Sequence, residues 1–377
     1  MTTDVLVIGG GIVGQVAALD LAGAGARVTL VDAGENAGST ANAGSLHVQM
    51  QSRFIRLYPD HAPNVERALP FYAQAAALWA DLEADLGPMD LVRNGGLMLA
   101  ESADQMRFLE EKARREEAKG LDVVLLDRAA LDTVAPWIGA DIVGAELCRN
   151  EGKLNPLRAN TVLAARTAGL GMKTVSDRIE ALEATASGVT ARGRKGRYEA
   201  SEVIVAAAWG SGALVRELGI EIPTAAEPLH MNITEACDQR IDHLVQHAER
   251  SITLKQFKTG QIVIGGGWPA TDRGRNTVPG VRQSSLTGNV ALAARLAPAI
   301  GALRVIRTWA GMNTTADGAS IIGRLPQASR VVMAVPGDAG YTLGPLVARM
   351  AAAIVLEKDP PADPAPFTPA RFPLLSA

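Results

Sequence analysis

Two short apolar runs at the start of the chain enclose a stretch of helical spacing. Residues 5–8 form one run rich in β-branched side chains, and residues 28–31 form the other. Between them Val13, Ala17 and Leu21 recur at the spacing of one helix face. Short apolar runs of this kind are typical of strands buried on both faces of a parallel sheet. The segment therefore predicts one strand–helix–strand unit.

The rest of the chain mixes both patterns. Helical spacing predicts helices at 71–86, 104–118, 156–168 and 346–356. The helix at 104–118 is highly charged, so we expect it to face solvent. Apolar runs predict strands at 97–100, 172–175, 203–207 and 331–335. A hairpin is predicted from residues 252–257 and 261–264, closed through Gly260. The Pro-rich tail from Asp359 is expected to run over the surface.

The order of these elements predicts two interleaved domains. Strands of the buried, parallel type occur at the start, middle and end of the chain, and hairpin-like and charged segments lie between them. We expect an α/β fold (α+β overall), in which a discontinuous Rossmann-type domain is interleaved with an antiparallel-sheet substrate domain. The expected boundaries are 1–85, 145–217 and 305–377 for the first domain and 86–144 and 218–304 for the second.

Composition excludes several classes of function. The 377 residues are 47% hydrophobic and 20% charged, as in soluble globular proteins, and the net charge of −3 gives no case for nucleic acid. Cys148 and Cys237 are the two cysteines, too few for an iron–sulfur cluster or a disulfide-stapled domain. No uninterrupted apolar run reaches the ~18 residues of a membrane span. The first residues lack a basic signal region, so we expect a cytoplasmic protein with no transmembrane segment and no metal site.

A glycine motif lies between the first strand and the first helix. In Gly9-x-Gly11-x-x-Gly14, the first glycine permits a tight turn, the second lets the backbone approach a pyrophosphate, and the third lets the helix pack on the strand. Asp32 ends the second strand at the spacing expected of the acid that binds a ribose 2′-hydroxyl. A 2′-phosphate would be repelled there. The motif predicts a dinucleotide site but leaves FAD and NAD as alternatives.

Further motifs resemble the D-amino-acid oxidase family of FAD enzymes, which includes glycine oxidase, sarcosine oxidase and D-amino-acid dehydrogenase. The resemblance covers nearly the whole chain and implies FAD rather than NAD. The matching segments are Ser39-Thr40-Ala41-Asn42-Ala43-Gly44, Glu151-Gly152-x-x-Asn155-Pro156, Val205-Ala206-Ala207-Ala208-Trp209, Trp309-Ala310-Gly311, Asp317-Gly318-x-x-Ile321-Ile322-Gly323, Gly337-Asp338-Ala339-Gly340-Tyr341-Thr342-Leu343 and Phe367-x-Pro369-x-Arg371-Phe372.

The resemblance implies a set of FAD contacts. Besides Gly9, Gly11, Gly14 and Asp32, the cofactor residues expected are Ile12, Val13, Ala33, Thr40, Asn42, Ala43, Gly44, Val175, Ala207, Trp209, Gly311, Gly337, Ala339, Gly340, Tyr341 and Thr342. The backbone of Val175 is expected to contact adenine. Neither cysteine occupies a family attachment position, so the flavin is expected to be non-covalent.

A narrower resemblance is to the β subunits of opine oxidases, hydroxyproline dehydrogenases and hydrogen cyanide synthase. It rests on the runs at 41–49, 253–256 and 264–269. Those proteins work with partner subunits that carry other redox centres. The resemblance implies oxidation of a secondary amine or amino acid by hydride transfer to flavin N5. A stand-alone glycine, sarcosine or D-amino-acid oxidase that makes hydrogen peroxide is one alternative, and a non-catalytic flavin-binding subunit is another.

Two positions depart from the family pattern. Asn313 stands near the place of an arginine that grips the substrate carboxylate in many members, and Asp338 follows Gly337 where histidine is common. A compensating cation is therefore expected from Arg53, Arg56 or Lys255, because guanidinium and ammonium groups bind carboxylates.

Six residues are candidates for a role in catalysis: Lys255, His47, Arg53, Arg56, Asn313 and Tyr341. A lysine in the region of Lys255 assists oxygen reduction in some oxidases of the family, whereas an exposed strand lysine is the alternative. Each arginine is weighed against a surface ion pair, and His47 against a buried, hydrogen-bonded histidine. Tyr341 either covers the flavin or packs in the core. For His230, a structural role is favoured.

Overall fold

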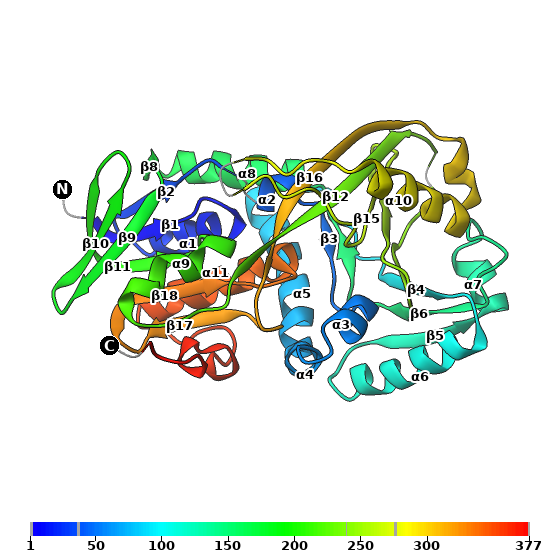
Figure 1. The fold of residues 1–377 in the computed structure, drawn as a ribbon, viewed down its shortest axis with the longest axis horizontal. Helices are drawn as coiled ribbons and strands as arrows, with labels where there is room; N and C mark the ends of the chain where they lie inside the picture. Colours follow the sequence, from blue (N-terminus) through cyan, green and yellow to red (C-terminus); the bar gives the residue numbers. More distant parts are fainter. Residues whose placement is uncertain (1–2, 36–37, 239, 275–276, 376–377) are drawn as a thin grey trace.

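The computed structural model describes residues 3–35, 38–238, 240–274 and 277–375. Two large mixed sheets and their helices make up the molecule (Figure 1). The first sheet contains β1 (Thr3–Ile8), β2 (Val28–Asp32), β8 (Lys173–Ser176), β9 (Ile179–Thr185), β10 (Gly188–Gly193), β11 (Arg197–Val205), β17 (Ile321–Leu325) and β18 (Ala328–Val335). The second contains β4 (Gly96–Ala100), β5 (Val123–Asp127), β6 (Gly144–Cys148), β12 (Ala225–Ala236), β13 (Leu244–His247), β14 (Thr253–Gln256), β15 (Gln261–Gly265) and β16 (Val305–Thr315).

The first sheet confirms the predicted strand–helix–strand unit. β1 lies between β2 and β11, parallel to both, and β18 runs parallel to β11 on the far side. α1 (Ile12–Gly23) connects β1 to β2. The order β17-β18-β11-β1-β2-β8 brings together strands from the start, middle and end of the chain. The parallel strands at 172–175, 203–207 and 331–335 are therefore confirmed to within a few residues.

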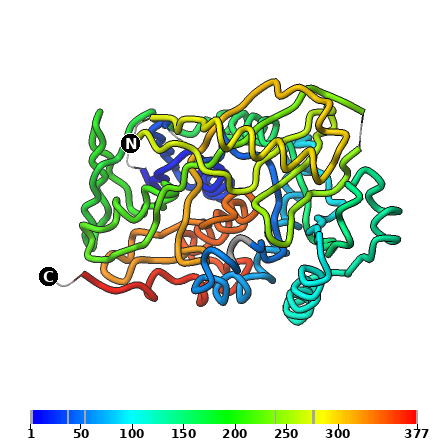
Figure 2. Tube along the Cα trace, turned by 45° about the vertical axis from the view of Figure 1, so that its right-hand side comes forward, coloured from blue at the N-terminus to red at the C-terminus, as the bar shows by residue number. Residues whose placement is uncertain are grey.

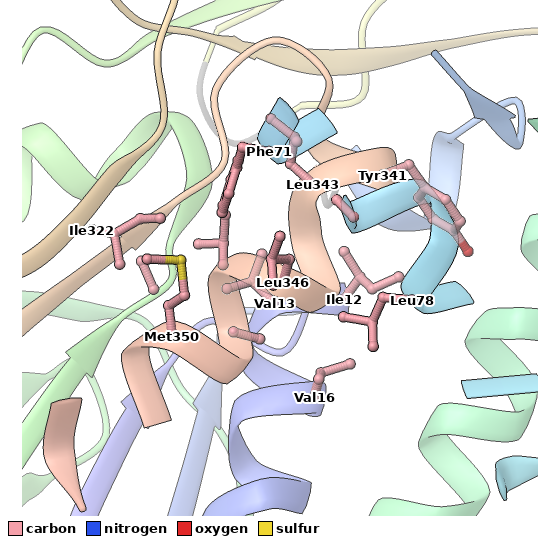
Figure 3. Close-up of a cluster of buried hydrophobic side chains, with 14 of the residues drawn as sticks. Ile12, Val13, Val16, Phe71, Leu78, Ile322, Tyr341, Leu343, Leu346 and Met350 are labelled. Carbon is pink, nitrogen blue, oxygen red and sulfur yellow. The ribbon is translucent and has the colours of Figure 1, made fainter. Parts of the chain in front are cut away.

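Both faces of the first sheet are covered. Val5 and Val7 pack with a helical layer, which Figure 3 shows as the contact of α1 with α5 (Leu69–Leu86) and α11 (Gly340–Val355). Leu6 and Ile8 point to the other face and pack with the β9–β10 hairpin and α9 (Ser211–Val215). In a strand buried on both faces, apolar residues do not alternate with polar ones, because neither face meets water. This explains why residues 5–8 are apolar without interruption.

Helices cover one face of the second sheet and, through α6 (Ala103–Glu117), part of the other face. Leu97, Val245, Leu254 and Ile264 pack with α7 (Arg128–Val134) and α10 (Gln283–Leu296). Its strand pairs are antiparallel except for β13 and β4, which run parallel. The expectation of an antiparallel sheet is corrected at this pair. The chain between the two strands is long enough to return in the same direction.

The sheets divide the chain differently from the expected boundaries. β6 pairs with β4 and β5, and β16 pairs with β12, so both belong to the second sheet although they fall in ranges expected for the Rossmann-type domain. The Trp309-Ala310-Gly311 motif therefore lies on β16, in the second sheet. We propose domain boundaries that follow the sheets. Figure 2 shows the β9–β10 hairpin (green) on the left and the segment around α6 and α7 (cyan to teal) on the right.

The remaining described elements are short or lie outside the sheets. Apart from short 3-10 helices, they are β3 (Ser45–Leu46), paired with β7 (Gly152–Lys153), and the helices α2 (Gly38–Ala41), α3 (Ser52–Leu57), α4 (Ala62–Arg67), α6 (Ala103–Glu117) and α8 (Pro156–Gly169). The C-terminal tail follows the surface but is anchored, because Phe367 is buried against Phe71 with ring centroids 4.5 Å apart. None of the helices in the described part of the chain combines the length and apolar character needed to cross a bilayer.

The charged helix α6 departs from its expected exposure. Lys112 is 1% exposed and Glu116 is fully buried. Lys112 Nζ donates to Glu116 (2.9 Å), Glu146 (2.8 Å) and Gln49 (3.2 Å). The helical period places these two charges on one face, but the partners that bury them come from distant segments. Solvent exposure was therefore the wrong prediction for this face.

Candidate active site

A cavity of about 660 Å³ lies where the carboxyl ends of the parallel strands meet the second sheet. Ligands of open α/β sheets bind outside these strand ends. The cavity is bordered by the turns after β1, β2, β11 and β18, by residues 41–47, by β12, β14 and β16, and by the glycines after β15.

The turn after β1 has the geometry of a phosphate-binding loop. Gly9 has φ +109°, and a Cβ at this position would lie 2.3 Å from the carbonyl oxygen of Ala206. A Cβ on Gly14 would lie 1.7 Å from the carbonyl oxygen of Gly9, so α1 packs closely on the turn. Gly11 is the N-cap of α1 and borders the cavity. The free N–H groups and positive dipole end of this helix therefore face the space where a phosphate would bind.

Asp32 is fixed at the end of β2. Its carboxylate accepts hydrogen bonds from the backbone N–H of Gly10 and, at 2.5 Å, from that of Gly34. Asp32 and Ala33 both border the cavity. Beyond them, Asp177 and Arg178 border the same end, and Arg178 pairs with Glu35. Since the carboxylate sits beside the phosphate-binding turn, it lies where a ribose hydroxyl can donate to it.

The opposite end of the cavity is formed by small residues of distant segments. A Cβ on Gly311 would lie 2.4 Å from the Cβ of Ala41, and Trp309 Nε1 donates to the carbonyl oxygen of Ala41 at 2.9 Å. The strand β16 is thereby held against residues 41–43. Asn42 and Ala43 border the cavity, as does the first turn of α11. This helix begins at Gly340, so its free N–H groups point to the same end.

Most of the expected cofactor residues border this cavity. They are Gly9, Gly11, Ile12, Val13, Asp32, Ala33, Asn42, Ala43, Ala207, Trp209, Gly311, Gly337, Ala339, Gly340, Tyr341 and Thr342. Gly14, Thr40, Gly44 and Val175 are not among the described residues that border it. Gly14 and Gly44 pack closely on backbone instead, because a Cβ would lie 1.7 Å from the carbonyl oxygen of Gly9 and 2.1 Å from that of Leu154, respectively. Val175 lies in β8, and the residues after it, from Asp177 on, border the cavity instead.

The expected catalytic residues separate into two groups. His47 and Asn313 border the cavity. Arg56 forms an ion pair with Glu249 (3.3 Å), which is the surface alternative. Tyr341 borders the cavity, but its ring stacks on Trp79 (5.3 Å) and its hydroxyl bonds to Asn160 (3.2 Å), which is the packing alternative. The side chain of Arg53 lies outside the described part of the structure.

Lys255 and His230 occupy opposite faces of the second sheet. Lys255 is fully buried, and its Nζ donates to Ser45 Oγ at 2.6 Å. Ser45 borders the cavity, so the lysine is one hydrogen bond away from it. His230 borders the cavity, yet its Nε2 bonds to Asn232 (2.9 Å), which in turn bonds to Asn289 of α10. The imidazole therefore lies on the face covered by α10, in agreement with the structural role.

Comparison with known proteins identifies the family. The family model described as FAD dependent oxidoreductase (DAO) matches residues 4–354. The chain belongs to this family. It is 26% identical to glycine oxidase from Pseudomonas aeruginosa over 98% of this chain and 99% of that protein. Glycine oxidase from Bacillus licheniformis is 24% identical over 94% and 93% of the two chains. The structure of glycine oxidase from Geobacillus kaustophilus aligns with a TM-score of 0.86 and 21% identity over 99% of both chains.

The residues of this DAO-family member fit FAD. Glycines leave the space that a Cβ would fill at the phosphate-binding turn. Some of the described polar atoms that are buried without a hydrogen-bond partner belong to cavity-bordering residues, namely Arg178 Nε, His47 Nδ1, His230 Nδ1 and Thr342 Oγ1, whereas the others lie elsewhere. Buried polar atoms normally have partners. A polar dinucleotide would supply them, whereas an apolar ligand would not. The described residues contain no cluster of His, Cys, Asp and Glu suited to a metal ion.

Several cavity-bordering residues are absent from the expected set. Ser45, Met231, Thr253, the last residue of β15 (Gly265) and the two glycines after it border the cavity. Gly266 has φ +104°, and a Cβ there would lie within 2.4 Å of the Ile252 backbone. The predicted hairpin and the run of glycines were the available signals. The run at 264–269 entered the sequence analysis only through the narrower resemblance, because its closeness to the cofactor site depends on sheet pairing.

His47 connects the cavity to the polar network of α6. Its Nδ1 lies 3.8 Å from Glu151 Oε1. Glu151 is fully buried and accepts hydrogen bonds from Gln49 Nε2 (2.8 Å) and from the backbone N–H of Val48 (2.8 Å). Gln49 also accepts from Lys112. The segment that carries His47 is therefore held in place by the buried charges of Glu151 and Lys112, on its side away from the cavity.

Proposed function

We propose that the chain oxidises the carbon–nitrogen bond of an opine-like secondary amine or imino acid, as the catalytic subunit of a multi-subunit dehydrogenase. FAD-dependent oxidation of amines and amino acids is the activity of its family. One observation carries the narrower proposal. The three runs that resemble opine-oxidase β subunits contribute Ser45 and His47, Thr253, and the glycines 265–267 to the same end of the cavity. The resemblance is thus concentrated where a substrate would bind.

The protein's own contribution is to bind and orient the substrate. Bound FAD supplies a ring that accepts a hydride from the substrate carbon. Leu229 and Met231 provide an apolar wall that excludes water, and the glycines after β15 leave room beside it. Asn313 provides neutral hydrogen-bond donors on the same face of the sheet. No strong base is needed on the carbon, because the hydrogen leaves as hydride.

The charges around the cavity do not distinguish an opine-like substrate from glycine. The cations among its described border residues are Arg178 and Arg194, which lie near the Asp32 end. Beside Asn313 there is a carboxylate, Glu227, at 3.2 Å. A small amino acid depends on a cation for its single carboxylate, because an unpaired desolvated anion is costly. An opine-like substrate carries at least two carboxylates and needs such partners even more, so the proposal rests on the resemblance of the three runs and not on these charges.

A stand-alone glycine or amino-acid oxidase is the second candidate. Glycine oxidases from two genera share 24–26% identity with nearly the whole chain. The same FAD site would serve such an enzyme, and oxygen would then be the electron acceptor.

The deciding experiment is an anaerobic screen of the purified FAD-loaded chain. Opines, cyclic imino acids, glycine, sarcosine and D-amino acids are added in turn, and loss of the oxidised flavin absorbance is recorded. Bleaching by opines or imino acids supports the proposal. Bleaching by glycine or D-amino acids alone supports the second candidate. A flavin that no amine reduces would identify a binding subunit without turnover and overturn both.

A further inference from the structure

A buried lysine is joined to the cavity by a single serine. Lys255 lies on the face of β14 that points away from α10, as does Thr253, which borders the cavity. Lys255 has no exposed surface. Its Nζ bonds to Ser45 Oγ at 2.6 Å, and Ser45 borders the cavity. Ser45 therefore connects the buried lysine to the border of the cavity.

The surroundings of Lys255 disfavour its charged form. An ammonium has three donors, but Ser45 is the partner of Lys255 among the described residues, and no carboxylate there pairs with it. Burial and, second, the charge of Lys153 lower the pKa of Lys255 to about 7. Lys153, on β7, donates to the carbonyl oxygen of Ile241 at 2.8 Å. Lys255 is thus largely a neutral amine with a free electron pair above pH 7.

Other titratable groups in this region are engaged elsewhere. Asp242 acts on Lys153 and His243, and it raises the pKa of Lys153, which burial lowers to about 8. His47 faces Glu151, at 3.8 Å. None of these groups supplies a counter-charge to Lys255 within the described chain.

We propose that Ser45 and Lys255 form a proton relay that deprotonates the substrate's ammonium group before the C–H bond is oxidised. The relay rests on the proposed amine oxidation. The substrate N–H bond breaks as a new O–H bond forms on Ser45, and Ser45 passes its own proton to the Lys255 amine. The products are a neutral substrate amine, an unchanged serine and a Lys255 ammonium. The step consumes no oxidant.

Hydride transfer requires a neutral substrate amine, which the relay would supply. An aliphatic amine with a pKa near that of lysine, about 10.4, is almost wholly protonated at neutral pH. A protonated nitrogen has no electron pair to assist hydride departure. An ordinary lysine would be protonated too and could accept nothing, whereas an acceptor with a pKa near the working pH takes up and releases a proton efficiently.

The test is the pH dependence of anaerobic flavin reduction in the holoenzyme. In the natural chain the rate should rise through about pH 7 and then level. Lys255→Met and Ser45→Ala should lower the rate at neutral pH by about 10²-fold, and the rate should then rise with pH up to the substrate's own pKa. Ser45→Thr keeps the hydroxyl and should keep the profile. Lys258→Met, in the exposed turn of the same hairpin, is the matched control.

A further variant tests the sign of the electrostatics. The positive charge of Lys153 lowers the pKa of Lys255, so Lys153→Met should raise that pKa and move the rising limb to higher pH. The Lys255 Nζ titration can also be followed by NMR in lysine-labelled apoprotein, with the signal assigned from Lys255→Met. Titration near 7 is expected.

The outcomes separate the relay from the proposed function. If amines bleach the flavin but Lys255→Met and Ser45→Ala keep the natural pH profile, the relay is wrong and amine oxidation stands. Titration of Lys255 above pH 9 would also overturn the relay. If no amine bleaches the flavin of the natural chain, amine oxidation fails, and the relay that rests on it fails with it.

Discussion

Asn313 on β16 donates a hydrogen bond to the carboxylate of its cross-strand partner Glu227 on β12, at 3.2 Å. The position where many family members hold a carboxylate-binding arginine thus carries a neutral amide attached to an acid. An arginine placed here would meet Glu227 directly. The pair therefore gives this part of the cavity hydrogen-bonding capacity without a positive charge.

Substitution of Asn313 should weaken substrate binding modestly. Loss of one neutral hydrogen bond, about 0.5–1.5 kcal/mol, corresponds to a roughly 2- to 12-fold higher Kd in Asn313→Ala. Asn313→Asp should bind carboxylate-containing substrates more weakly still, because it adds a second negative charge beside Glu227. Flavin absorbance titration with a carboxylate ligand measures both, and Thr315→Val on the same strand is the control. Equal affinity in Asn313→Asp and the natural chain would remove Asn313 from the site.

Asp32→Ala should weaken FAD binding. The acid borders the cavity at the phosphate-binding turn, and a charge-assisted hydrogen bond contributes about 1.5–3 kcal/mol, or roughly 10- to 150-fold in Kd. Its contact with the Gly10 N–H also holds the turn in place. Reconstitution of apoprotein with FAD measures the change. Asp4→Asn, which breaks a surface ion pair with Arg27 on the same sheet, should leave FAD affinity unchanged.

Acid precipitation should release the flavin. Neither Cys148 nor Cys237 is among the described residues that border the cavity, and Cys148 is buried elsewhere in the core. The supernatant should be yellow and the pellet colourless. A yellow pellet would show a covalent bond to the chain.

An artificial dye should support faster turnover than oxygen. This follows from the proposed role as a subunit that passes electrons to partners. Steady-state rates of the lone chain with a redox dye and with dissolved oxygen provide the comparison, and peroxide is measured in parallel. Peroxide formation at the dye-supported rate would favour the stand-alone oxidase.

Lys112→Met should strongly destabilise the fold. Lys112 holds Glu116 and Glu146 in a region without solvent, and removing one member of such a cluster typically costs about 3–5 kcal/mol. Burial raises the pKa of Glu116 well above its usual range, so Glu116 holds a proton at neutral pH. The cluster then carries one negative charge, on Glu146, against the positive charge of Lys112. Denaturant unfolding measures the loss. Lys119→Met, exposed just after the same helix, should change stability by no more than about 0.5 kcal/mol. Equal midpoints for both variants would contradict this assignment.

Local signals predicted the cofactor half of the molecule well. The turn of Gly9 to Gly14, the helix after it and Asp32 are neighbours in sequence, so spacing alone defines their geometry. The buried face of α6 could not be predicted in this way. Lys112 and Glu116 look like solvent-facing charges until Glu146 and Gln49, from other segments, are brought against them.

The substrate end shows the same limit. Lys255 was weighed as exposed or functional, and the strand pattern gave no means of deciding, because its burial involves β3, a distant segment whose Ser45 bonds to it. Tyr341 belongs to a motif that resembles a flavin loop, yet its ring lies in the core, where it stacks on Trp79 of α5. Sequence spacing predicts which segments meet a cofactor more reliably than it predicts the direction of each side chain.

The interleaving of the first sheet also has a consequence for biosynthesis. β1 and β2 leave the ribosome early, but their sheet neighbour β11 begins at Arg197 and the next strand, β18, at Ala328. At about 5–20 residues per second, the first strands wait roughly ten seconds or more for the partners that cover their edge. Helix α11, whose first turn borders the cavity, is made later still. The FAD site is therefore complete only after the first turn of α11 has been synthesised, and a nascent chain stalled before residue 328 would lack part of it.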